Sequence, residues 1–282
     1  MELDEKRSAL NERLRQLGSV IVAYSGGVDS AYLAWAAHQV LGTAMLAALA
    51  DSASLARSHY QDAVAFAEEN GIPLLLLETK ELEHEAYAAN RGDRCFHCKD
   101  ELFTVLEAER ARRQMAAVAY GLNLDDGRDF RPGQKAAQEH HVVAPLAEAG
   151  LTKADIRTLA QAAGLRVWDK PASACLSSRI EYGRRVTTEA LRQVEEAEEA
   201  LRAMGLRRFR VRHHGSVARI EIAEEEMATA LDPEFFKRMA AAVRGAGFPY
   251  VAVDCDGYRS GSMNELLPAE MLAGAQPGAR VS

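Results

Sequence analysis

Short apolar runs alternate with segments of helical periodicity through residues 1–170. The apolar runs predict strands at Ser19–Ala23, Ala44–Ala50, Ile72–Leu77 and Met115–Tyr120. The helical segments predict helices at Val28–Leu41, Leu55–Asn70, Glu101–Arg113 and Thr152–Ala163. Strands that are apolar throughout and alternate with helices are typical of a parallel sheet covered on both faces. We therefore predict an α/β fold with a doubly wound parallel sheet in this part of the chain.

The alternation stops near residue 170, where Pro171 and a run of small residues follow. Beyond this point the pattern predicts a long charged helix, two strands, a further helix and a last strand, at Thr187–Met204, Arg208–His213, Val217–Ile222, Pro233–Ala246 and Tyr250–Asp254. This order is typical of a smaller α+β unit. We predict two domains, formed by residues 1–170 and 171–282.

Composition and charge exclude several classes of protein. The chain has 282 residues, of which 48% are hydrophobic and 27% charged, which excludes a disordered or fibrous protein. No apolar run approaches the ~20 residues of a membrane span, so we expect no membrane partner. Lys and Arg number 34 against 41 Asp and Glu, and this net charge of -7 disfavours nucleic acid as a partner. The charged N-terminus and only four cysteines predict a cytoplasmic setting.

The sharpest local signal is a glycine-rich segment between the first predicted strand and the first predicted helix. We call it the phosphate loop; it consists of Ser25, Gly26, Gly27, Val28, Asp29 and Ser30. Its two glycines let the backbone approach a phosphate, and the helix that follows contributes free amide groups. The two serines add hydroxyl donors, and the aspartate can act through bound Mg²⁺. The loop is neither a Walker A sequence nor Gly-x-Gly-x-x-Gly. A tight turn without a ligand is the alternative interpretation.

The cysteines form a second signal. Cys95 and Cys98 have a spacing that lets two sulfurs share a metal, but the second such pair of a zinc ribbon is absent. A zinc site of another kind and simple burial are the alternatives for this pair. Cys175 lies between small residues and Arg179, a setting that favours an exposed, activated thiolate. For Cys255 we expect the commoner case, a small buried hydrophobic residue.

Basic residues alternate along the first predicted strand of the second domain. Arg208, Arg210, Arg212 and His214 stand at every second position, so they share one face of a strand. A row of guanidinium groups is suited to binding a phosphate. A solvated basic face is the alternative. An RNA-binding strip is a weaker interpretation, because Phe209 alone supplies an interleaved aromatic ring.

Further charged residues are candidates for the same chemistry. Glu198 and Glu221 are candidate ligands of a divalent ion near the arginines, with simple solvation as the alternative. Lys99, next to the cysteine pair, is a candidate for moving a proton or stabilising a carbonyl oxygen, with an ordinary surface lysine as the alternative. Asp125 and Asp126 follow the strand predicted to end at Tyr120, so they face the crevice at the strand ends or cap a loop.

Taken together, these segments resemble the LarE family of ATP-dependent sulfurtransferases, which belongs to the PP-loop, or N-type ATP pyrophosphatase, superfamily. The resemblance covers most of the chain and is carried by Ser25–Ser30, Arg94–Lys99, Gly121–Asp126, Cys175–Ile180 and Arg210–Arg212. It implies a small-molecule substrate, a pyridinium biscarboxylate mononucleotide, in the synthesis of the nickel-pincer nucleotide cofactor of lactate racemase. ATP would adenylate one carboxylate and release pyrophosphate. A sulfur nucleophile would then displace AMP and leave a thiocarboxylate.

The resemblance also implies roles for single residues and for both domains. Residues 1–170 would be the ATP-binding domain, with ATP and Mg²⁺ at the phosphate loop, Asp125 and Asp126, and adenosine at Asp51 and Ser52. Residues 171–282 would bind the substrate and form a homo-oligomer. The mononucleotide phosphate would be held by Ser178, Arg179, Arg210 and Arg212. Lys99 would stabilise the adenylated carbonyl group or transfer a proton.

The LarE family contains two sulfur sources. In one, the cysteine that corresponds to Cys175 gives up its own sulfur and becomes dehydroalanine, so each molecule reacts once. In the other, three cysteines hold a [4Fe-4S] cluster whose fourth iron carries an exchangeable sulfide. Cys95, Cys98 and Cys175 match the second arrangement, and the Cys-x-x-Cys pair has no evident role in the first. We therefore favour the cluster.

Three other functions are compatible with parts of the sequence. A tRNA thiolase of the same superfamily is disfavoured by the acidic charge and by the lack of a second Cys-x-x-Cys pair. An ammonia-using synthetase of the NAD or GMP type leaves the cysteines without a role. A non-catalytic nucleotide- or metal-sensing module would bind ATP and release no pyrophosphate.

Overall fold

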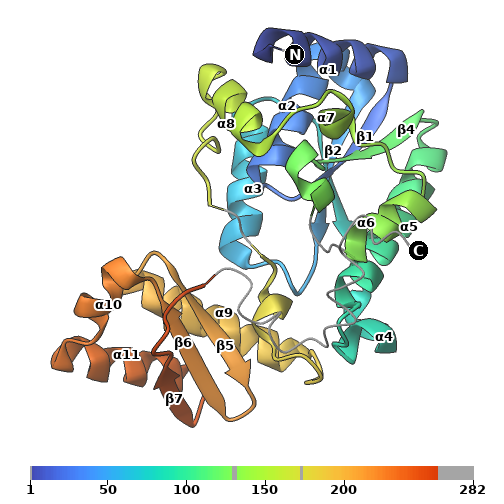
Figure 1. The fold of residues 1–282 in the computed structure, drawn as a ribbon. Coiled ribbons are helices and arrows are strands. Elements are labelled where there is room, and N and C mark those ends of the chain that lie inside the picture. The colour runs from blue at the N-terminus through green and yellow to red at the C-terminus, as the bar shows by residue number, and fades with distance from the viewer. Residues whose placement is uncertain (1, 129–131, 172–173, 260–282) are drawn as a thin grey trace, which may run out of the picture. The chain divides into compact units, whose positions relative to one another are not determined.

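The chain forms two compact units (Figure 1). The computed structural model describes residues 2–128, 132–171 and 174–259. Unit 1 contains the described residues of 2–81 and 95–171, and unit 2 contains those of 82–94 and 174–259. Within these residues, every helix is too short or too polar to cross a membrane.

The segment 82–94 belongs to unit 2, although its place in the sequence puts it with the first predicted domain. The side-chain amide of Asn90 donates hydrogen bonds to the carbonyl groups of Glu181 and Arg184, at 2.8 and 3.0 Å. The Tyr87 hydroxyl lies 2.5 Å from the Ser177 hydroxyl. Because these bonds join residues about ninety positions apart, no local pattern in the sequence indicates them.

A four-stranded parallel sheet forms the centre of unit 1. Its strands are β1 (Val20–Tyr24), β2 (Met45–Asp51), β3 (Leu74–Glu78) and β4 (Ala117–Tyr120), in the order β3-β2-β1-β4. The order reverses at β1, since β2 lies on one side of it and β4 on the other. In open α/β sheets, ligands bind beyond the carboxyl ends of the strands at such a reversal.

Helices cover both faces of this sheet. The helical segments of unit 1 are α1 (Leu3–Leu17), α2 (Val28–Leu41), η1 (Gly42–Ala44), α3 (Arg57–Glu69), α5 (Arg94–Arg112), η3 (Leu124–Arg128), α6 (Pro132–Glu139), α7 (Pro145–Glu148) and α8 (Lys153–Ala162). Val20, Val22 and Tyr24 of β1 pack with α1, α2, α3, α7 and α8. Ile21 and Ala23, which point the other way, pack with α5 and α6. The predicted doubly wound α/β fold is therefore confirmed.

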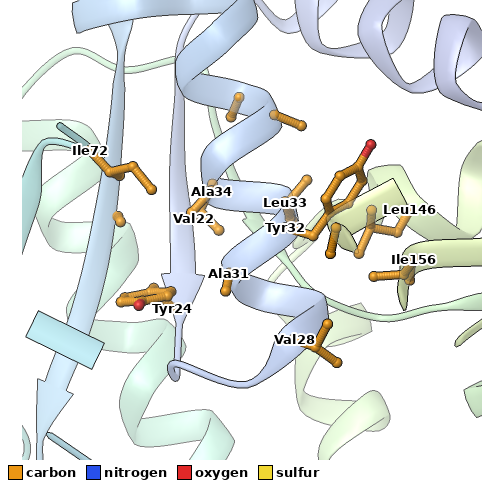
Figure 2. Packing of buried hydrophobic residues seen from close by; sticks show 14 of the residues in the cluster. Val22, Tyr24, Val28, Ala31, Tyr32, Leu33, Ala34, Ile72, Leu146 and Ile156 are labelled. Atoms are coloured by element: carbon orange, nitrogen blue, oxygen red, sulfur yellow. The ribbon is translucent and has the colours of Figure 1, made fainter. Parts of the chain in front are cut away.

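Helix α2 carries the phosphate loop at its amino end and is the most buried helix of unit 1. Its small residues Ala31 and Ala34 pack toward Val22 of β1, while Tyr32 on its other side packs near Leu146 of α7 (Figure 2). Small side chains on the sheet side let the helix approach the strands closely. This packing fixes the amino end of α2 beside the end of β1.

Two helices of unit 1 differ from the sequence-based prediction. Helix α1 was not predicted, although Leu10 and Leu14 form a buried stripe with i, i+4 spacing. Helix α5 begins at Arg94 rather than at Glu101. Cys95 therefore lies in the first turn of α5 and Cys98 in the second.

Unit 2 is a small α+β unit, as the sequence predicts. Its elements are α4 (Glu85–Ala88), η4 (Leu176–Arg179), α9 (Thr188–Ala203), β5 (Phe209–His214), β6 (Val217–Ile222), α10 (Glu224–Ala230), α11 (Pro233–Gly245) and β7 (Tyr250–Val253), and η2 (Glu81–Glu83) spans the join between the units. The sheet order is β5-β6-β7, with β5 antiparallel and β7 parallel to β6. Val194 and Leu201 of α9 and Met239 of α11 are fully buried, as are Val211 and Ile220 of the sheet.

Candidate functional site

Backbone geometry shapes the phosphate loop. The Ser30 hydroxyl accepts a hydrogen bond from the Ser25 amide and donates one to the Gly27 carbonyl, each at 3.1 Å. Gly26 has a φ of 70°, and a Cβ there would lie 2.7 Å from the Cβ of Ala63 in α3. Both the backbone conformation and the lack of space therefore require glycine. Helix α2 begins directly after the two glycines, so its first amide groups are available to an anion.

The end of β4 meets the phosphate loop. Gly121 follows β4, and a Cβ there would lie 2.8 Å from the Ser30 nitrogen and 3.1 Å from the Asp29 carbonyl carbon. Only glycine permits this approach. The contact brings together the ends of β1 and β4, the two strands at the reversal of the strand order.

Lys153 joins three parts of this region. Its ammonium group donates to Oδ2 of Asp29 at 2.5 Å, and its backbone amide donates to Oδ2 of Asp125 at 2.8 Å. Thr152 caps helix α8, which fixes Lys153 in the first turn. Lys153 was not singled out from the sequence, because it lies in an ordinary helix start with no motif around it.

The second oxygen of Asp29 has unused hydrogen-bonding capacity. Oδ1 is buried and accepts no hydrogen bond from the part of the chain that the structure describes. Burial raises the pKa of Asp29, and the Lys153 ammonium partly opposes that rise. This carboxylate has one oxygen without a hydrogen bond and lies beside the amide groups of the phosphate loop. It is therefore suited to holding Mg²⁺ between the protein and a phosphate.

Asp125 and Asp126 form the loop that follows β4. The side-chain oxygen of Asn123 accepts hydrogen bonds from both backbone amides, at 2.9 and 3.2 Å. The Asp126 carboxylate in turn accepts from the Asn123 amide at 3.3 Å. These bonds support the loop-capping interpretation of the aspartates. The Asp125 carboxylate accepts in addition from Lys153, which connects this loop to α8.

The end of β2 carries a compact polar cluster. Arg57 donates to the Asp51 carboxylate at 2.6 Å and to the Ser52 carbonyl at 2.9 Å. The hydroxyls of Ser52 and Ser54 both donate to Glu81, whose side chain is 2% exposed. Arg57, Ser54 and Glu81 were missed from the sequence. A serine pair followed by arginine gave only a weak signal, and Glu81 lies almost thirty residues further along.

Near the start of α5, Cys95 is exposed and Cys98 is half-buried. Residues three apart on a helix lie on the same side, so both thiols face one region. The Lys99 ammonium lies 5.7 Å from the centre of the Phe103 ring. Gly133 packs closely on Lys99, since a Cβ at Gly133 would lie 2.9 Å from its Cγ.

Cys175 is exposed at the start of η4 in unit 2, as the sequence predicts. Its carbonyl accepts hydrogen bonds from the Ser178 hydroxyl at 2.7 Å and from Arg179 at 3.1 Å. Cys255 is also exposed, so the expectation that it is a buried hydrophobic residue is wrong. It follows β7 in a turn that exposes its side chain. No group of three or more metal-ligating side chains occurs within residues 2–128, 132–171 and 174–259.

A buried ion pair links η4 to α9. Arg179 and Glu198 are each 1% exposed, and two guanidinium nitrogens of Arg179 donate to the two oxygens of Glu198 at 3.0 and 3.2 Å. Glu198 also accepts from the backbone amide of Val211 in β5 at 3.2 Å. Burial alone would raise the pKa of Glu198, but Arg179 reverses this and brings it below its usual value. Both side chains thus have a structural role that the sequence does not reveal.

A second network lies on the face of the sheet opposite α9. We call it the charged face; it consists of Arg210, Arg212, Arg219, Glu221 and Asp254. The fully buried Glu221 accepts from Arg212 at 2.7 Å and pairs with Arg219 at 3.2 Å. Arg219 also pairs with Asp254. Arg208, which the sequence placed in the same row, precedes β5 and pairs with Glu225.

Arg210 differs from the other arginines of the charged face. No carboxylate among the described residues lies within ion-pair distance of its guanidinium group, which donates to the Phe209 carbonyl at 2.7 Å. The guanidinium carbon lies 5.1 Å from the centre of the Tyr258 ring. Burial and the positive charge of Arg179 lower the pKa of Arg210. An anion bound at Arg210 would compensate this charge.

Comparison with known proteins places the chain among relatives of similar length. Residues 3–124 match the NAD synthase family. The chain is 39% identical to an uncharacterised protein of Synechocystis over 94% of its own length and 99% of that protein. It is 36% identical to the pyridinium-3,5-bisthiocarboxylic acid mononucleotide synthase of Lactiplantibacillus plantarum, over 96% of this chain and 98% of that enzyme. An uncharacterised protein of Methanocaldococcus jannaschii is 27% identical over 92% of this chain.

Proposed function

Because the chain belongs to the family of the pyridinium-3,5-bisthiocarboxylic acid mononucleotide synthase, the LarE family, we propose that it is an ATP-dependent sulfurtransferase acting on a pyridinium biscarboxylate mononucleotide. ATP adenylates one carboxylate of the substrate and pyrophosphate leaves. A sulfur nucleophile then attacks the carbonyl carbon, AMP leaves, and a thiocarboxylate remains. The adenylation is needed because a free carboxylate resists nucleophiles and has no good leaving group.

The phosphate loop is the observation that carries the ATP chemistry. The amides at the start of α2 and the hydroxyls of Ser25 and Ser30 suit the phosphates, and Gly26 keeps the backbone accessible. Oδ1 of Asp29, which accepts no hydrogen bond from the described residues, suits Mg²⁺, and the ion would neutralise the departing pyrophosphate. Lys153 donates to Oδ2 of Asp29 and so fixes the orientation of the carboxylate. The end of β2, with Asp51 and Ser52, is the proposed place of adenosine.

Unit 2 is the proposed place of the mononucleotide phosphate. Arg210 is half-buried and has no carboxylate within ion-pair distance among the described residues, although the charge of Glu198 attracts it from further away, so its guanidinium group is available to an anion. Arg212 and Arg179 are held by Glu221 and Glu198, which fixes their positions and limits their freedom to move toward a ligand. We therefore assign the direct phosphate contact to Arg210 and a supporting place to the two paired arginines.

For the sulfur, the proposal retains the [4Fe-4S] cluster held by Cys95, Cys98 and Cys175. When bound, such a cluster would supply an exchangeable sulfide. The exposed thiols of Cys95 and Cys175, and the position of Cys98 on the same side of α5, suit this role. The alternative retained is sulfur donation by Cys175 itself. The homo-oligomer and the cytoplasmic location stay predictions.

The main test is a reaction under anaerobic conditions with ATP, Mg²⁺ and the biscarboxylate mononucleotide. We expect AMP and pyrophosphate to form only when the mononucleotide is present, together with a product whose mass shows sulfur in place of oxygen. Release of ADP and phosphate would contradict the proposal. ATP binding without any turnover would favour the sensing module instead. Thiolation of tRNA under the same conditions would favour the tRNA thiolase.

A second test separates the two sulfur sources. Iron and acid-labile sulfide are assayed after anaerobic purification, and the intact protein mass is measured after turnover. Under the cluster route, Cys95→Ala abolishes sulfur transfer and the mass is unchanged. Under the sacrificial route, Cys95→Ala is active and the protein becomes lighter by one hydrogen sulfide. Cys175→Ser is inactive in both, and Cys255→Ser, which removes another exposed thiol of unit 2, is the matched control.

A further inference from the structure

An aromatic ring lies beside Arg210, the arginine of the charged face that has no carboxylate within ion-pair distance in the described part of the chain. The Tyr258 ring centre lies 5.1 Å from the guanidinium carbon of Arg210. The other two arginines of this face pair with Glu221, and Arg219 pairs also with Asp254. An aromatic face attracts a cation through its quadrupole but does not neutralise the charge. Arg210 therefore keeps its attraction for an anion beside the Tyr258 ring, and its own place is set by the bond to the Phe209 carbonyl.

A specific turn sets the position of Tyr258. The Gly257 amide donates to the Asp254 carbonyl at 3.2 Å, and the Tyr258 amide donates to the Ile222 carbonyl at 2.9 Å. Gly257 has a φ of 69°, and a Cβ there would lie 2.7 Å from the Ile222 oxygen. Only glycine fits this turn. The Asp254 carboxylate accepts from the Asp256 amide at 2.8 Å and pairs with Arg219, which fixes the turn on the charged face.

We propose that Tyr258 is a substrate-binding residue whose ring stacks on the cationic pyridinium ring of the mononucleotide while Arg210 binds its phosphate. This inference rests on the proposed function and names the part of unit 2 that recognises the base. A bound phosphate neutralises Arg210, and the Tyr258 ring can then attract the positive ring of the same ligand. The two side chains together select a ligand that carries an anion and a flat cation.

The stacking assignment differs from a purely structural role for Tyr258. A structural tyrosine would stabilise the turn and affect every ligand of unit 2 equally. A stacking tyrosine affects ligands that carry an aromatic cation and leaves phosphates without a ring unchanged. The quadrupole belongs to the aromatic ring and does not need the hydroxyl group. If Tyr258 acts by stacking, the Tyr258→Phe variant should therefore bind the ligand as the tyrosine does.

The test measures binding of three probes by calorimetry to the full-length protein. The probes are nicotinamide mononucleotide with its cationic ring, the dihydro form with a neutral ring, and ribose 5-phosphate without a ring. Tyr258→Leu and Tyr258→Phe test the ring, and Arg210→Gln tests the phosphate contact. Tyr250→Leu is the matched control. Tyr250 is 65% exposed and pairs with Val217, whereas Arg210 pairs with Glu221 at the other end of β6.

We expect Tyr258→Leu to weaken binding of nicotinamide mononucleotide about 2-fold to 30-fold, the range of one cation–π contact. The loss should be smaller for the dihydro form and absent for ribose 5-phosphate. Tyr258→Phe and Tyr250→Leu should bind all three probes like the unchanged protein. An equal loss for all probes, no loss for the mononucleotide, or a Tyr258→Phe variant as weak as Tyr258→Leu would each overturn the stacking assignment.

Arg210→Gln gives a separate answer about the proposed function. We expect it to weaken binding of all three probes, because all three carry the phosphate. If Arg210→Gln binds ribose 5-phosphate like the unchanged protein, or if the unchanged protein binds neither phosphate nor mononucleotide, the phosphate site itself is wrong. If Arg210→Gln fails for every probe while Tyr258→Leu has no effect, the phosphate site stands and the stacking assignment alone falls.

Discussion

The phosphate loop of unit 1 and the charged face of unit 2 are both suited to phosphate, but different forces hold them in shape. In the loop, Gly26 and Gly121 create close backbone contacts, and the amides of α2 are held in place by the packing of the helix. On the charged face, buried guanidinium and carboxylate groups such as Arg212 and Glu221 fix one another. The shape of the loop therefore depends on glycines that leave room for close backbone contacts. The shape of the charged face depends on ion pairs between its side chains.

This difference determines how each site responds to substitution. Added volume disturbs a site made of close backbone contacts, whereas loss of charge should leave most of it intact. In unit 2, the removal of one charge leaves its partner buried and uncompensated, which costs more than the pair itself contributes. The tryptophans, Trp35 and Trp168, both lie in unit 1, so their fluorescence reports on that unit. Hydrogen exchange of α9 reports on unit 2.

The largest effect is expected from Glu198→Gln. Loss of the carboxylate charge leaves the Arg179 guanidinium group buried beside a neutral amide. Breaking such a buried ion pair lowers the free energy of unfolding by about 3–5 kcal/mol. Hydrogen exchange of the α9 amides should accelerate, because unit 2 opens more often when its free energy of unfolding falls. The control is Glu196→Gln on the same helix, whose exposed pair with Arg192 is screened by solvent and should contribute little to stability. Equal effects of the two substitutions would show that the Arg179 pair does not hold unit 2 together.

An intermediate effect is expected from Gly121→Ala in unit 1. The new Cβ would meet the Ser30 nitrogen at 2.8 Å, and backbone atoms cannot move aside as flexible side chains do. We expect the free energy of unfolding, measured by tryptophan fluorescence, to fall by about 1–3 kcal/mol. We also expect ATP to bind more weakly. Gly245→Ala in α11 of unit 2 is the control for an added methyl group, because no described residue outside its own helix and chain neighbours has an atom within 4 Å of the added Cβ; its stability is measured by hydrogen exchange of α9. Unchanged stability and unchanged ATP affinity in Gly121→Ala would contradict the role of close packing in the loop.

The same contrast explains which parts of the sites were predictable from the sequence. The phosphate loop is a contiguous segment between a strand and a helix, so its glycines and its place at the sheet edge follow from local patterns. The α/β fold was predictable for the same reason, since the apolar strands of unit 1 are continuous. Lys153 and Glu81 were missed, because each reaches its partner from a distant and ordinary segment.

In unit 2 the sequence indicated the residue types but not their partners. The alternation of Arg210 and Arg212 correctly placed them on one face of β5. Nothing in the sequence shows that Arg179 and Glu198 use their charges on one another, or that Arg210 rests on Tyr258. Those facts depend on how η4, α9 and the turn after β7 pack. Long-range pairing of charges is a tertiary property, so local periodicity does not contain it.

The smallest effect is expected from the pH dependence of unit 2. Burial lowers the pKa of His213 below its ordinary value of 6.5, and the nearby charges of Arg184 and His214 lower it further. The geometry agrees with a neutral ring, because Nδ1 accepts from the Gly215 amide at 3.2 Å and Nε2 lies 3.2 Å from the side-chain oxygen of Gln193. Protonation of Nδ1 would break the bond to Gly215.

Since the folded pKa of His213 is depressed, its contribution is fully present above about pH 6.5 and is lost as the pH falls through the folded value. The unfolded state then binds a proton that the folded state excludes, with a slope of at most about 1.4 kcal/mol per pH unit. Urea unfolding followed by circular dichroism from pH 8 to pH 5.5 measures this slope. His213→Gln should flatten it relative to the unchanged protein, while the tryptophan transition of unit 1 keeps its pH dependence. An identical slope in the variant would mean that the charged residues of this unit, rather than its buried histidine, set its sensitivity to acid.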